Sequence, residues 1–465
     1  MTICNPSGRE IRTTIWRAAL LYVSFAALGT GVEPAAAQAI DLVRDTEIER
    51  VLHGYEDPIL NVAGLDSHII RIYMVSDPSI NAFAMHGPAA SETTDIFVNT
   101  GLLMQLKTPN EVTGVLAHET GHIAGGDLTR DTKAMAKASI PMLIGMAAGV
   151  AAMIAGAGDA GMAIMGIGAQ AAQSQFLSFS RSQEATADQR GQKFLLATHQ
   201  SGRGMLDVFE RMADEEAMSA RYNAPLISDH PADRERIDLM EREVEASPYR
   251  DVPDSPEAVH EFHMIQAKLT GFLDPVDMVL SHYPASDTSE EAHYARAIAY
   301  FRQPDMQKAL DETNTLVKLE PKNPYFWELL GQIYVEMSQP EKGVGPYQRS
   351  VDILPNAPLL RVSLAAAQLA TEMSPMAKPA LENLKVALRQ ENDDSFAWFE
   401  AAQAYSELGN QPMADLSTAE RYYNVGAMKT AAHFANEAQR KLPKGSTDWQ
   451  RAGDIMLVAG PEANK

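Results

Sequence analysis

Cysteine is almost absent from this sequence. Cys4 is the only cysteine among 465 residues, so neither an intramolecular disulfide nor a cysteine-based zinc site can form. Cys4 also lies in a segment that we expect to be removed on export, which leaves the mature chain without a catalytic thiol. Any metal ion in this protein must therefore be held by histidine and carboxylate side chains.

Basic residues are scarce as well. The chain carries 39 Lys and Arg against 61 Asp and Glu, which gives a formal net charge of -22 at pH 7. A protein that coats nucleic acid needs an excess of positive charge, so we expect no nucleic-acid partner. The 45% content of hydrophobic residues excludes wholesale disorder, and the length predicts two or three folded units.

The start of the chain predicts a signal peptide. Three arginines precede the apolar run Ala18–Leu28, which is shorter than the roughly 20 residues of a membrane-spanning helix. Small residues at Ala35–Ala37 suit a signal peptidase, with cleavage after Ala37 or Ala39. A retained membrane anchor is the alternative. We therefore expect residues 1–37 to be removed and the mature chain to be exported.

The next part of the chain predicts one helix and three short strands. Apolar residues recur at helical spacing over 41–65, and Gly64 then predicts a turn. The residue pattern indicates strands at His68–Val75, Ile80–Met85 and Asp95–Asn99. We expect these strands to form a small antiparallel sheet.

A long stretch with almost no charge lies further along. The only charged residue in 140–180 is Asp159. The stretch is rich in Ala, Gly and Met, so it is much less hydrophobic than a leucine-rich membrane helix, and Gly156–Asp159 predicts a turn. We expect a helical hairpin over 138–180 that packs on the folded domain or makes a peripheral contact with a membrane. A bilayer-spanning helix at Ala138–Gly158 is the alternative.

The C-terminal half predicts a helical repeat. Three prolines within 247–256 predict a linker, and beyond it Ala- and Leu-rich helices recur with a period near 34 residues. This period is typical of the tetratricopeptide repeat, in which small residues let paired helices pack closely. We expect stacked helical hairpins over 257–460, with a generic helical bundle as the alternative. The positions that match at this spacing are Ala297 with Gly331, Tyr300 with Tyr334, and Ala309 with Gly343.

The strongest motif is the segment His118–His122, which reads His-Glu-Thr-Gly-His. Two histidines four residues apart project from the same face of a helix, so both rings can reach one zinc ion. Glu119 then points toward the position of a water molecule. A helix start at Thr108–Glu111 places the motif on a capped helix that runs to about Gly125. The sequence therefore predicts a hydrolytic metal site.

A catalytic zinc ion needs a third protein ligand from another part of the chain. The candidates are Glu184, His199 and His230. Glu184 and Asp188 lie one turn apart on a predicted helix, so a ligand and a supporting carboxylate would share one face. We choose Glu184 as the third ligand, and an ordinary solvated helix face is the alternative for both acids.

Together these motifs resemble the M48 family of zinc metallopeptidases, and in particular its exported members that carry tetratricopeptide repeats. The resemblance covers nearly the whole mature chain. The segments that carry it are Phe97–Leu103, His118–His122, Glu184 with Asp188, and His230-Pro231 followed by Arg236-Ile237.

The resemblance implies a role for each residue of the motif. His118, His122 and Glu184 would ligate one zinc ion per chain. Glu119 would be the general base, which accepts a proton from the attacking water and then protonates the leaving amine.

The resemblance extends to three further residues. The resemblance implies that Asp188 and Arg236 support the ligands and that His230 lies close to the metal. His230 would donate a hydrogen bond to the oxyanion, occupy the open zinc position in a resting state, or simply cap a helix. Many relatives carry a further histidine where this chain has Asp127, a position that we do not expect to supply a ligand.

The expected fold class is α+β and mostly helical. A zincin-like metallopeptidase domain with a small antiparallel sheet would occupy 41–246, and an all-α tetratricopeptide-repeat solenoid would follow it. Peptide substrate would add as a strand beside Ile80–Met85 or Asp95–Asn99, where main-chain pairing gives affinity with little sequence preference.

The function implied is that of a periplasmic zinc endopeptidase that cleaves unfolded or misassembled envelope proteins. The concave face of the repeats would hold unfolded protein clients or the outer-membrane protein assembly machinery. One alternative is a chaperone or adaptor in which proteolysis is mostly silenced. Another is a membrane-embedded peptidase, which depends on the apolar stretch within 138–180.

Overall fold

The computed structural model describes residues 23–25, 40–87, 93–128, 181–221, 234–371 and 374–463. Most of the predicted signal peptide, the predicted hairpin over 138–180 and His230 lie outside these residues. The chain forms two compact units. We call Glu49–Phe262 the sheet unit, and Met1–Ile48 with His263–Lys465 the repeat unit. The domain limits expected from the sequence remain predictions.

Three strands form the sheet of the sheet unit. β3 (Ile70–Val75), β4 (Ala82–His86) and β5 (Thr94–Asn99) pair in the order β3-β5-β4. β5 runs parallel to β3 and antiparallel to β4. The small sheet is therefore mixed, whereas the sequence predicted an antiparallel one. The reason is the chain path, because the chain leaves β3, forms the outer strand β4 and returns between the two as β5.

The burial of the strands follows their positions. Buried and half-buried residues alternate along β3, so one face of this strand packs on the core. In β5 every residue from Asp95 to Asn99 is buried, as expected for a strand with a neighbour on both sides. β4 is the outer strand of the three, and Met85 near its end is exposed.

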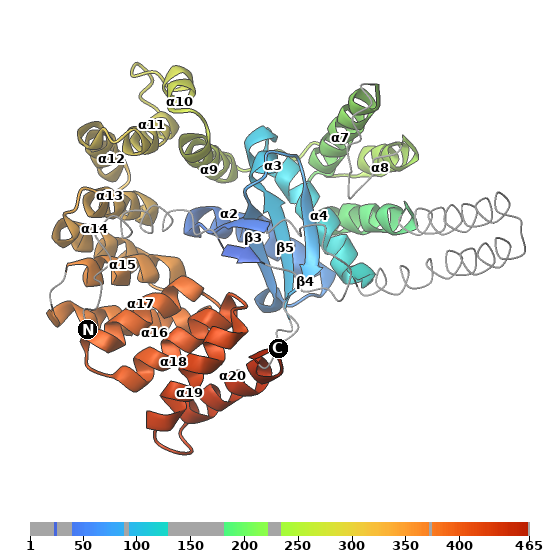
Figure 1. Cartoon of the computed structure of the whole chain (residues 1–465). Helices are drawn as coiled ribbons and strands as arrows, with labels where there is room; N and C mark the ends of the chain where they lie inside the picture. Colours follow the sequence, from blue (N-terminus) through green and yellow to red (C-terminus); the bar gives the residue numbers. More distant parts are fainter. Residues whose placement is uncertain are drawn as a thin grey trace, which may run out of the picture. The chain divides into compact units, whose positions relative to one another are not determined.

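The helices of the sheet unit are drawn from blue to green in Figure 1. Most of them contribute to one core of buried apolar residues, which includes Ala117 of the helix that carries the histidine motif. The helices are α2 (Thr46–Ala63), which starts in the repeat unit, α3 (Thr100–Gln105), α4 (Pro109–Gly125), the helix over 181–197, α7 (Arg203–Arg221) and α8 (Arg234–Ala246). The core residues are Ile59, Ala117, Leu195, Met205, Leu206, Phe209, Met240 and Val244.

The ends of α4 are those that the sequence predicts. The Thr108 hydroxyl accepts a hydrogen bond of 3.2 Å from the backbone N–H of Glu111, and Pro109 occupies the first turn. At the other end Gly126 has a φ of 67°, and its N–H donates to the carbonyl of His122. The positive φ suits glycine, so the helix ends directly after the motif.

The repeat unit is built from helices, which Figure 1 draws in succession from yellow to red. α11, α13 and α15 begin 34 residues apart, so the predicted tetratricopeptide period is confirmed. The helices are α9 (Pro256–Leu273), which starts in the sheet unit, α10 (Val276–His282), α11 (Glu290–Arg302), α12 (Met306–Leu319), α13 (Pro324–Glu336), α14 (Pro340–Ile353), α15 (Pro358–Ala370), α16 (Ala377–Gln390), α17 (Ser395–Glu407), α18 (Gln411–Asn424), α19 (Met428–Lys441) and α20 (Thr447–Ala463).

Small residues bring paired helices of the repeat unit close together. A Cβ atom at Gly331 on α13 would lie 2.6 Å from the ring of Tyr347 on α14. A Cβ atom at Gly343 on α14 would lie 2.9 Å from the carbonyl oxygen of Gly331. Only glycine fits at these contacts, which explains why small residues recur at the repeat spacing.

A short segment near the start of the described chain also belongs to the repeat unit. It contains β2 (Ile40–Val43), which pairs antiparallel with β1 (Val23–Phe25). Just beyond β2, Lys268 Nζ lies 2.6 Å from the carboxylate of Asp45 and 3.1 Å from that of Glu47. All three side chains are buried, and we call them the Lys268 cluster.

The predicted fold class is confirmed for the described chain, which is mostly helical and has a small sheet followed by helical repeats. Among the helices that the structure describes, none combines the length and the apolar character needed to cross a bilayer.

Candidate metal centre

The two motif histidines face each other on α4. Their Nε2 atoms lie 3.1 Å apart, and their rings meet edge to face with centroids 4.7 Å apart. His118 is 1% exposed and His122 is 7% exposed. The spacing of one helical turn therefore brings two nitrogen donors to one buried point, as the sequence predicted.

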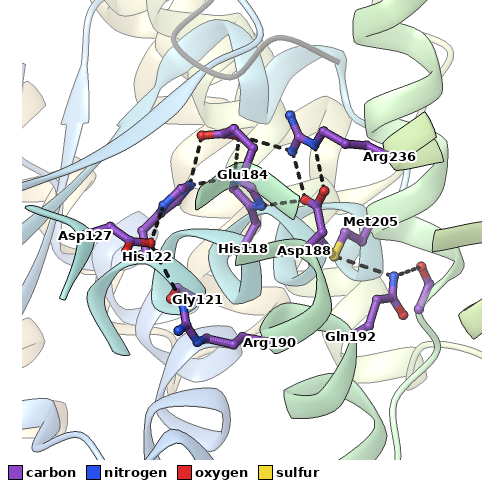
Figure 2. Close-up of polar contacts among 11 residues, drawn as sticks. His118, Gly121, His122, Asp127, Glu184, Asp188, Arg190, Gln192, Met205 and Arg236 are labelled. Carbon is purple, nitrogen blue, oxygen red and sulfur yellow. Dashed lines mark hydrogen bonds and ion pairs between the residues drawn. The ribbon is translucent and has the colours of Figure 1, made fainter. Parts of the chain in front are cut away.

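Glu184 reaches the same point from the helix over 181–197, as Figure 2 shows. Its carboxylate lies 3.3 Å from Nε2 of His122 and 3.5 Å from Nε2 of His118. The two helices approach closely because the motif contains Gly121. A Cβ atom there would lie 2.5 Å from the carbonyl oxygen of Ala187. A side chain at position 121 would push Glu184 away from the histidines.

The spacing of these donor atoms fits zinc. Two ligand atoms bound at about 2.0–2.1 Å to one tetrahedral zinc ion lie roughly 3.3 Å apart. The two Nε2 atoms are 3.1 Å apart, Oε1 of Glu184 lies 3.3 Å from Nε2 of His122, and Oε2 of Glu184 lies 3.5 Å from Nε2 of His118. One ligand atom from each of the three residues lies within 4.8 Å of the other two. The donor set of two imidazoles and one carboxylate is also one that zinc uses in hydrolytic sites.

Charge favours a cation at this point as well. Burial by itself lowers the pKa of His122, but hydrogen bonds to the carboxylates of Asp127 and Glu184 outweigh it and raise the pKa to about 10. The surrounding carboxylates thus favour a positive charge between them, either as a proton on His122 or as a metal ion.

Glu119 lies beside the donors without being one of the three. It follows His118 on α4 and is 2% exposed. Its negative charge contributes to the raised pKa values of both His122 and Glu56. This placement suits a carboxylate that acts on a water molecule next to the metal.

Asp188 and Arg236 form a second layer behind the donors (Figure 2). Arg236 on α8 makes two hydrogen bonds, of 2.7 and 2.9 Å, to the carboxylate of Asp188 and lies 3.1 Å from that of Glu184. Asp188 in turn lies 3.0 Å from Nδ1 of His118. Burial raises the pKa of Asp188, but Arg236 and His118 outweigh it and hold that pKa below its ordinary value. Asp188 therefore stays ionised beside the ring of His118.

Comparison with known proteins agrees with this geometry. Residues 44–244 match the family described as Peptidase family M48. A relative from Syntrophobacter fumaroxidans, named "Protease HtpX homolog", is 30% identical over 196 residues, which cover 36% of this chain and 67% of that protein. This chain belongs to peptidase family M48.

Other relatives of this M48 chain match over more of its length. The "Beta-barrel assembly-enhancing protease" of Escherichia coli is 22% identical over 389 residues, which cover 82% of this chain and 76% of that protein. The "Putative beta-barrel assembly-enhancing protease" of Vibrio cholerae is 25% identical, and the match covers 56% of this chain and 53% of that protein, about half its length. Among solved structures, the TPR protein YrrB is 20% identical, covering 37% of this chain and 89% of YrrB with a TM-score of 0.31.

The M48 site contains two residues for which the sequence predicted no role there. Phe209 on α7 packs against the ring of His118 with centroids 5.0 Å apart, and the guanidinium of Arg236 lies 5.1 Å from the centroid of the same phenyl ring. Asp127, expected not to be a ligand, lies 3.2 Å from Nδ1 of His122. The only signal for Phe209 was its place in an amphipathic helix, whereas Asp127 follows a Gly-Gly pair that ends α4.

A buried carboxyl group supports the motif from α2. The Thr120 hydroxyl, in the middle of the M48 motif, donates a short hydrogen bond to one carboxyl oxygen of Glu56. The other oxygen of Glu56 is buried and has no hydrogen-bond partner among the described residues. Burial raises the pKa of Glu56 to about 8, so this group is protonated at neutral pH.

The remaining ligand candidates lie elsewhere. His199 occupies a turn with a φ of 60°, and its ring packs against Tyr249 with centroids 4.6 Å apart. It is not among the three residues whose ligand atoms converge. His230 lies outside the described residues, so its place relative to this M48 site remains a prediction.

Proposed function

We propose that this protein is a zinc-dependent endopeptidase that is exported and cleaves unfolded or misassembled envelope proteins. The observation that carries the proposal is the convergence of His118, His122 and Glu184 on one buried point with Glu119 beside them. In this proposal each chain holds one zinc ion through these three ligands, and Asp188 and Arg236 support them from behind.

Several residues of the chain would have separate roles in peptide hydrolysis. Zinc, when bound, supplies a Lewis acid that lowers the pKa of water toward 7 and polarises the peptide carbonyl. Glu119 accepts the proton that the attacking water loses and passes it to the nitrogen of the leaving amine. Arg236 keeps Asp188 ionised, and Asp188 holds the ring of His118 in place.

Peptide substrate would pair with β4. Both sides of β5 are occupied, by β3 and by β4, so the edge at Asp95–Asn99 that the sequence allowed is closed to a further strand. Among the described strands, β5 is the only one that pairs with β4, which ends the strand order. Main-chain pairing along Ala82–His86 would hold a substrate with little preference for its sequence.

His230 would regulate or assist the reaction. A neutral imidazole that fills the open zinc position would displace the attacking water, whereas an imidazole that donates to the oxyanion would stabilise the transition state. We favour the first role. His230→Ala separates the two, because loss of a resting-state ligand raises basal cleavage and loss of an oxyanion donor lowers it. An unchanged rate would leave His230 as a capping residue.

The repeats would recruit substrate or partner proteins. The relatives in Escherichia coli and Vibrio cholerae are named for the enhancement of beta-barrel assembly. We propose that this chain acts in the periplasm, where its repeats would hold unfolded clients or contact the outer-membrane protein assembly machinery. The predicted signal peptide over 1–37 and a peripheral membrane contact through 138–180 are part of this proposal.

The burial of the site is the one observation that speaks for an alternative function. His118, Glu119 and Glu184 are each at most 4% exposed, so a substrate has to gain access before it can be cleaved. In the alternative, the protein is a chaperone or adaptor for outer-membrane protein assembly and its proteolysis is mostly silenced. An intact Glu119 beside the three donors supports the peptidase over this alternative.

Cleavage of casein by the purified full chain tests the proposal. We expect the wild type to cleave casein, a chelator to stop cleavage and added zinc to restore it. Glu119→Gln should retain zinc, because the change removes a base but no ligand. Its rate of casein cleavage should fall by a factor of about 10² to 10⁴. Equal turnover by Glu119→Gln would reject the assigned role, and no cleavage by a zinc-loaded wild type would favour the chaperone alternative.

A further inference from the structure

A carboxylate outside the predicted site lies against the second histidine. Asp127 is 2% exposed, and its Oδ2 atom is 3.2 Å from Nδ1 of His122. Figure 2 shows the two side chains facing each other behind the donor atoms. Asp127 contacts the ring nitrogen that points away from Glu184, so it leaves Nε2 of His122 directed at the point where the three donors converge.

The local sequence is built to return Asp127 to this ring. α4 ends at Gly125, and Gly126 reverses the chain with a φ of 67° that suits glycine. A Cβ atom at Gly125 would lie 2.9 Å from Oδ2 of Asp127. The Gly-Gly pair thus provides both the turn and the space that Asp127 needs to reach back one helical turn.

Arg190, from the helix that carries Glu184, helps to hold this arrangement. Its Nη1 atom donates a hydrogen bond of 3.2 Å to the carbonyl oxygen of Gly121 and lies 3.8 Å from Oδ2 of Asp127. A Cβ atom at Gly125 would lie 2.3 Å from Nη1 of Arg190, so the absence of a side chain there makes room for the guanidinium. The same contacts join the turn after α4 to the second ligand helix.

Each histidine therefore has its own carboxylate at Nδ1. Asp188 lies 3.0 Å from Nδ1 of His118, and Asp127 lies 3.2 Å from Nδ1 of His122. A carboxylate at Nδ1 fixes the tautomer with the proton on that nitrogen and leaves the Nε2 lone pair for a metal ion. It also makes the imidazole a stronger donor.

We propose that Asp127 is a positioning residue for zinc, acting through His122, and that it is the counterpart of Asp188 at His118. This inference rests on the proposed function. Each carboxylate is accompanied by an arginine. Asp188 receives two hydrogen bonds from Arg236, and Arg190 lies 3.8 Å from Asp127.

The test is the zinc affinity of the folded full chain, measured by competition with a chelator of known affinity. Asp127→Ala removes both the hydrogen-bond acceptor and the charge, and we expect it to weaken zinc binding about 10-fold to 100-fold. Asp127→Asn retains an acceptor for the Nδ1 proton, so this variant should lose less zinc affinity than Asp127→Ala. This graded series separates orientation of the ring from the contribution of charge.

Glu111→Gln is the matched control. Glu111 lies in the first turn of α4, at the end of the helix away from Asp127. It is 4% exposed and pairs with Arg211 at 3.0 Å, so its substitution disturbs a buried acid that has an arginine partner, as Asp127 does. We expect this variant to lose stability without zinc, as judged by its melting temperature, and to bind zinc like the wild type.

Two outcomes are separable. If the wild type binds zinc and Asp127→Ala binds it within about threefold, while its melting temperature without zinc falls as in Glu111→Gln, Asp127 is a structural residue only and the inference is wrong. If the wild type itself binds no zinc, the proposed function fails, and the role assigned to Asp127 fails with it.

Discussion

Burial sets the protonation of a carboxyl group next to the catalytic motif. Glu56 is fully buried, and its pKa rises to about 8 from an ordinary value of 4.5, first because of desolvation and then because of the nearby charges of Glu119 and Asp57. The unfolded chain releases this proton near pH 4.5, whereas the folded chain keeps it until about pH 8. The folded state thus binds more protons between these values, and stability falls as the pH rises through that window.

Glu56→Gln should weaken this pH dependence. The variant keeps an acceptor for Thr120 but has no proton to lose, so its free energy of unfolding should fall less between pH 5 and pH 8 than that of the wild type. Between these two pH values the wild type and the variant should differ by at most about 4 kcal/mol in this change. Denaturant titrations at the two pH values measure it. Asp57→Asn is the comparison variant, because it removes one exposed charge that contributes to the raised pKa of Glu56, and it should weaken the pH dependence much less. Equal pH dependence in wild type and Glu56→Gln would contradict the protonation assigned to Glu56.

The residue scale also shows what the sequence could and could not predict. His118, His122 and Glu184 could be proposed because helical spacing and the chemistry of zinc constrain them strongly. Phe209 and Asp127 could not, since a contact with a histidine ring depends on how α7 packs and on the turn after α4. Nothing in the spacing of an isolated aspartate or phenylalanine predicts such contacts.

At the scale of elements, close packing of two helices creates the site. α4 and the helix over 181–197 touch at glycines of both elements. Cβ atoms at Gly121 and Gly191 would lie 2.5 Å from the carbonyl oxygen of Ala187 and 3.2 Å from the backbone of Ala117, respectively. Elements that approach this closely cannot absorb an extra methyl group without moving apart.

Gly121→Ala should therefore damage both stability and metal binding. We expect a loss of about 1–3 kcal/mol in the free energy of unfolding and weaker zinc binding, because the displaced helix carries Glu184. Gly54→Ala is the matched control. It lies inside α2 with no atom within 4 Å of the added Cβ, so it should stabilise the protein by about 0.5–1 kcal/mol. Denaturant unfolding and chelator competition measure both effects. Normal zinc affinity in Gly121→Ala would show that the helices tolerate separation.

Element boundaries followed the sequence where local chemistry determines them. The Thr108 cap and the glycine end of α4 are local signals, and both hold in the structure. The sequence predicted an antiparallel sheet, but β5 runs parallel to β3. Strand direction could not be predicted because it depends on the path of the chain and not on the residues of each strand. The repeat period lengthens by three residues between α15 and α17, which begin 37 residues apart, because the 3-10 helix η2 (Ser374–Met376) extends the connection before α16.

At the scale of the whole molecule, the buried Lys268 cluster brings residues that are distant in sequence into contact. Lys268 on α9 lies between Asp45 and Glu47, and the hydroxyl of Tyr294 on α11 donates a hydrogen bond of 2.7 Å to Glu47. These residues all belong to the repeat unit, although more than two hundred positions separate Glu47 from Lys268. The sequence did not predict this, because nothing local links the segment before α2 to the repeats.

Lys268→Met should destabilise the repeat unit. It leaves two buried carboxylates without their cation, a change that costs about 3–5 kcal/mol. Lys308→Met is the control, because Lys308 pairs with Asp305 at 2.7 Å but its side chain is 59% exposed, so the loss of this pair should change stability little. Denaturant unfolding followed by circular dichroism compares the two. Similar small losses in both variants would mean that the Lys268 cluster contributes little.

The metal content of the purified full chain tests the central claim most directly. After incubation with zinc and removal of free metal by gel filtration, elemental analysis should find one zinc ion per wild-type chain. The same measurement should find one in Glu119→Gln, which retains all three donors, and markedly less in Glu184→Ala, which retains two. A wild-type chain without zinc, or a Glu184→Ala chain that holds zinc as firmly as the wild type, would contradict the site described for this M48 protein.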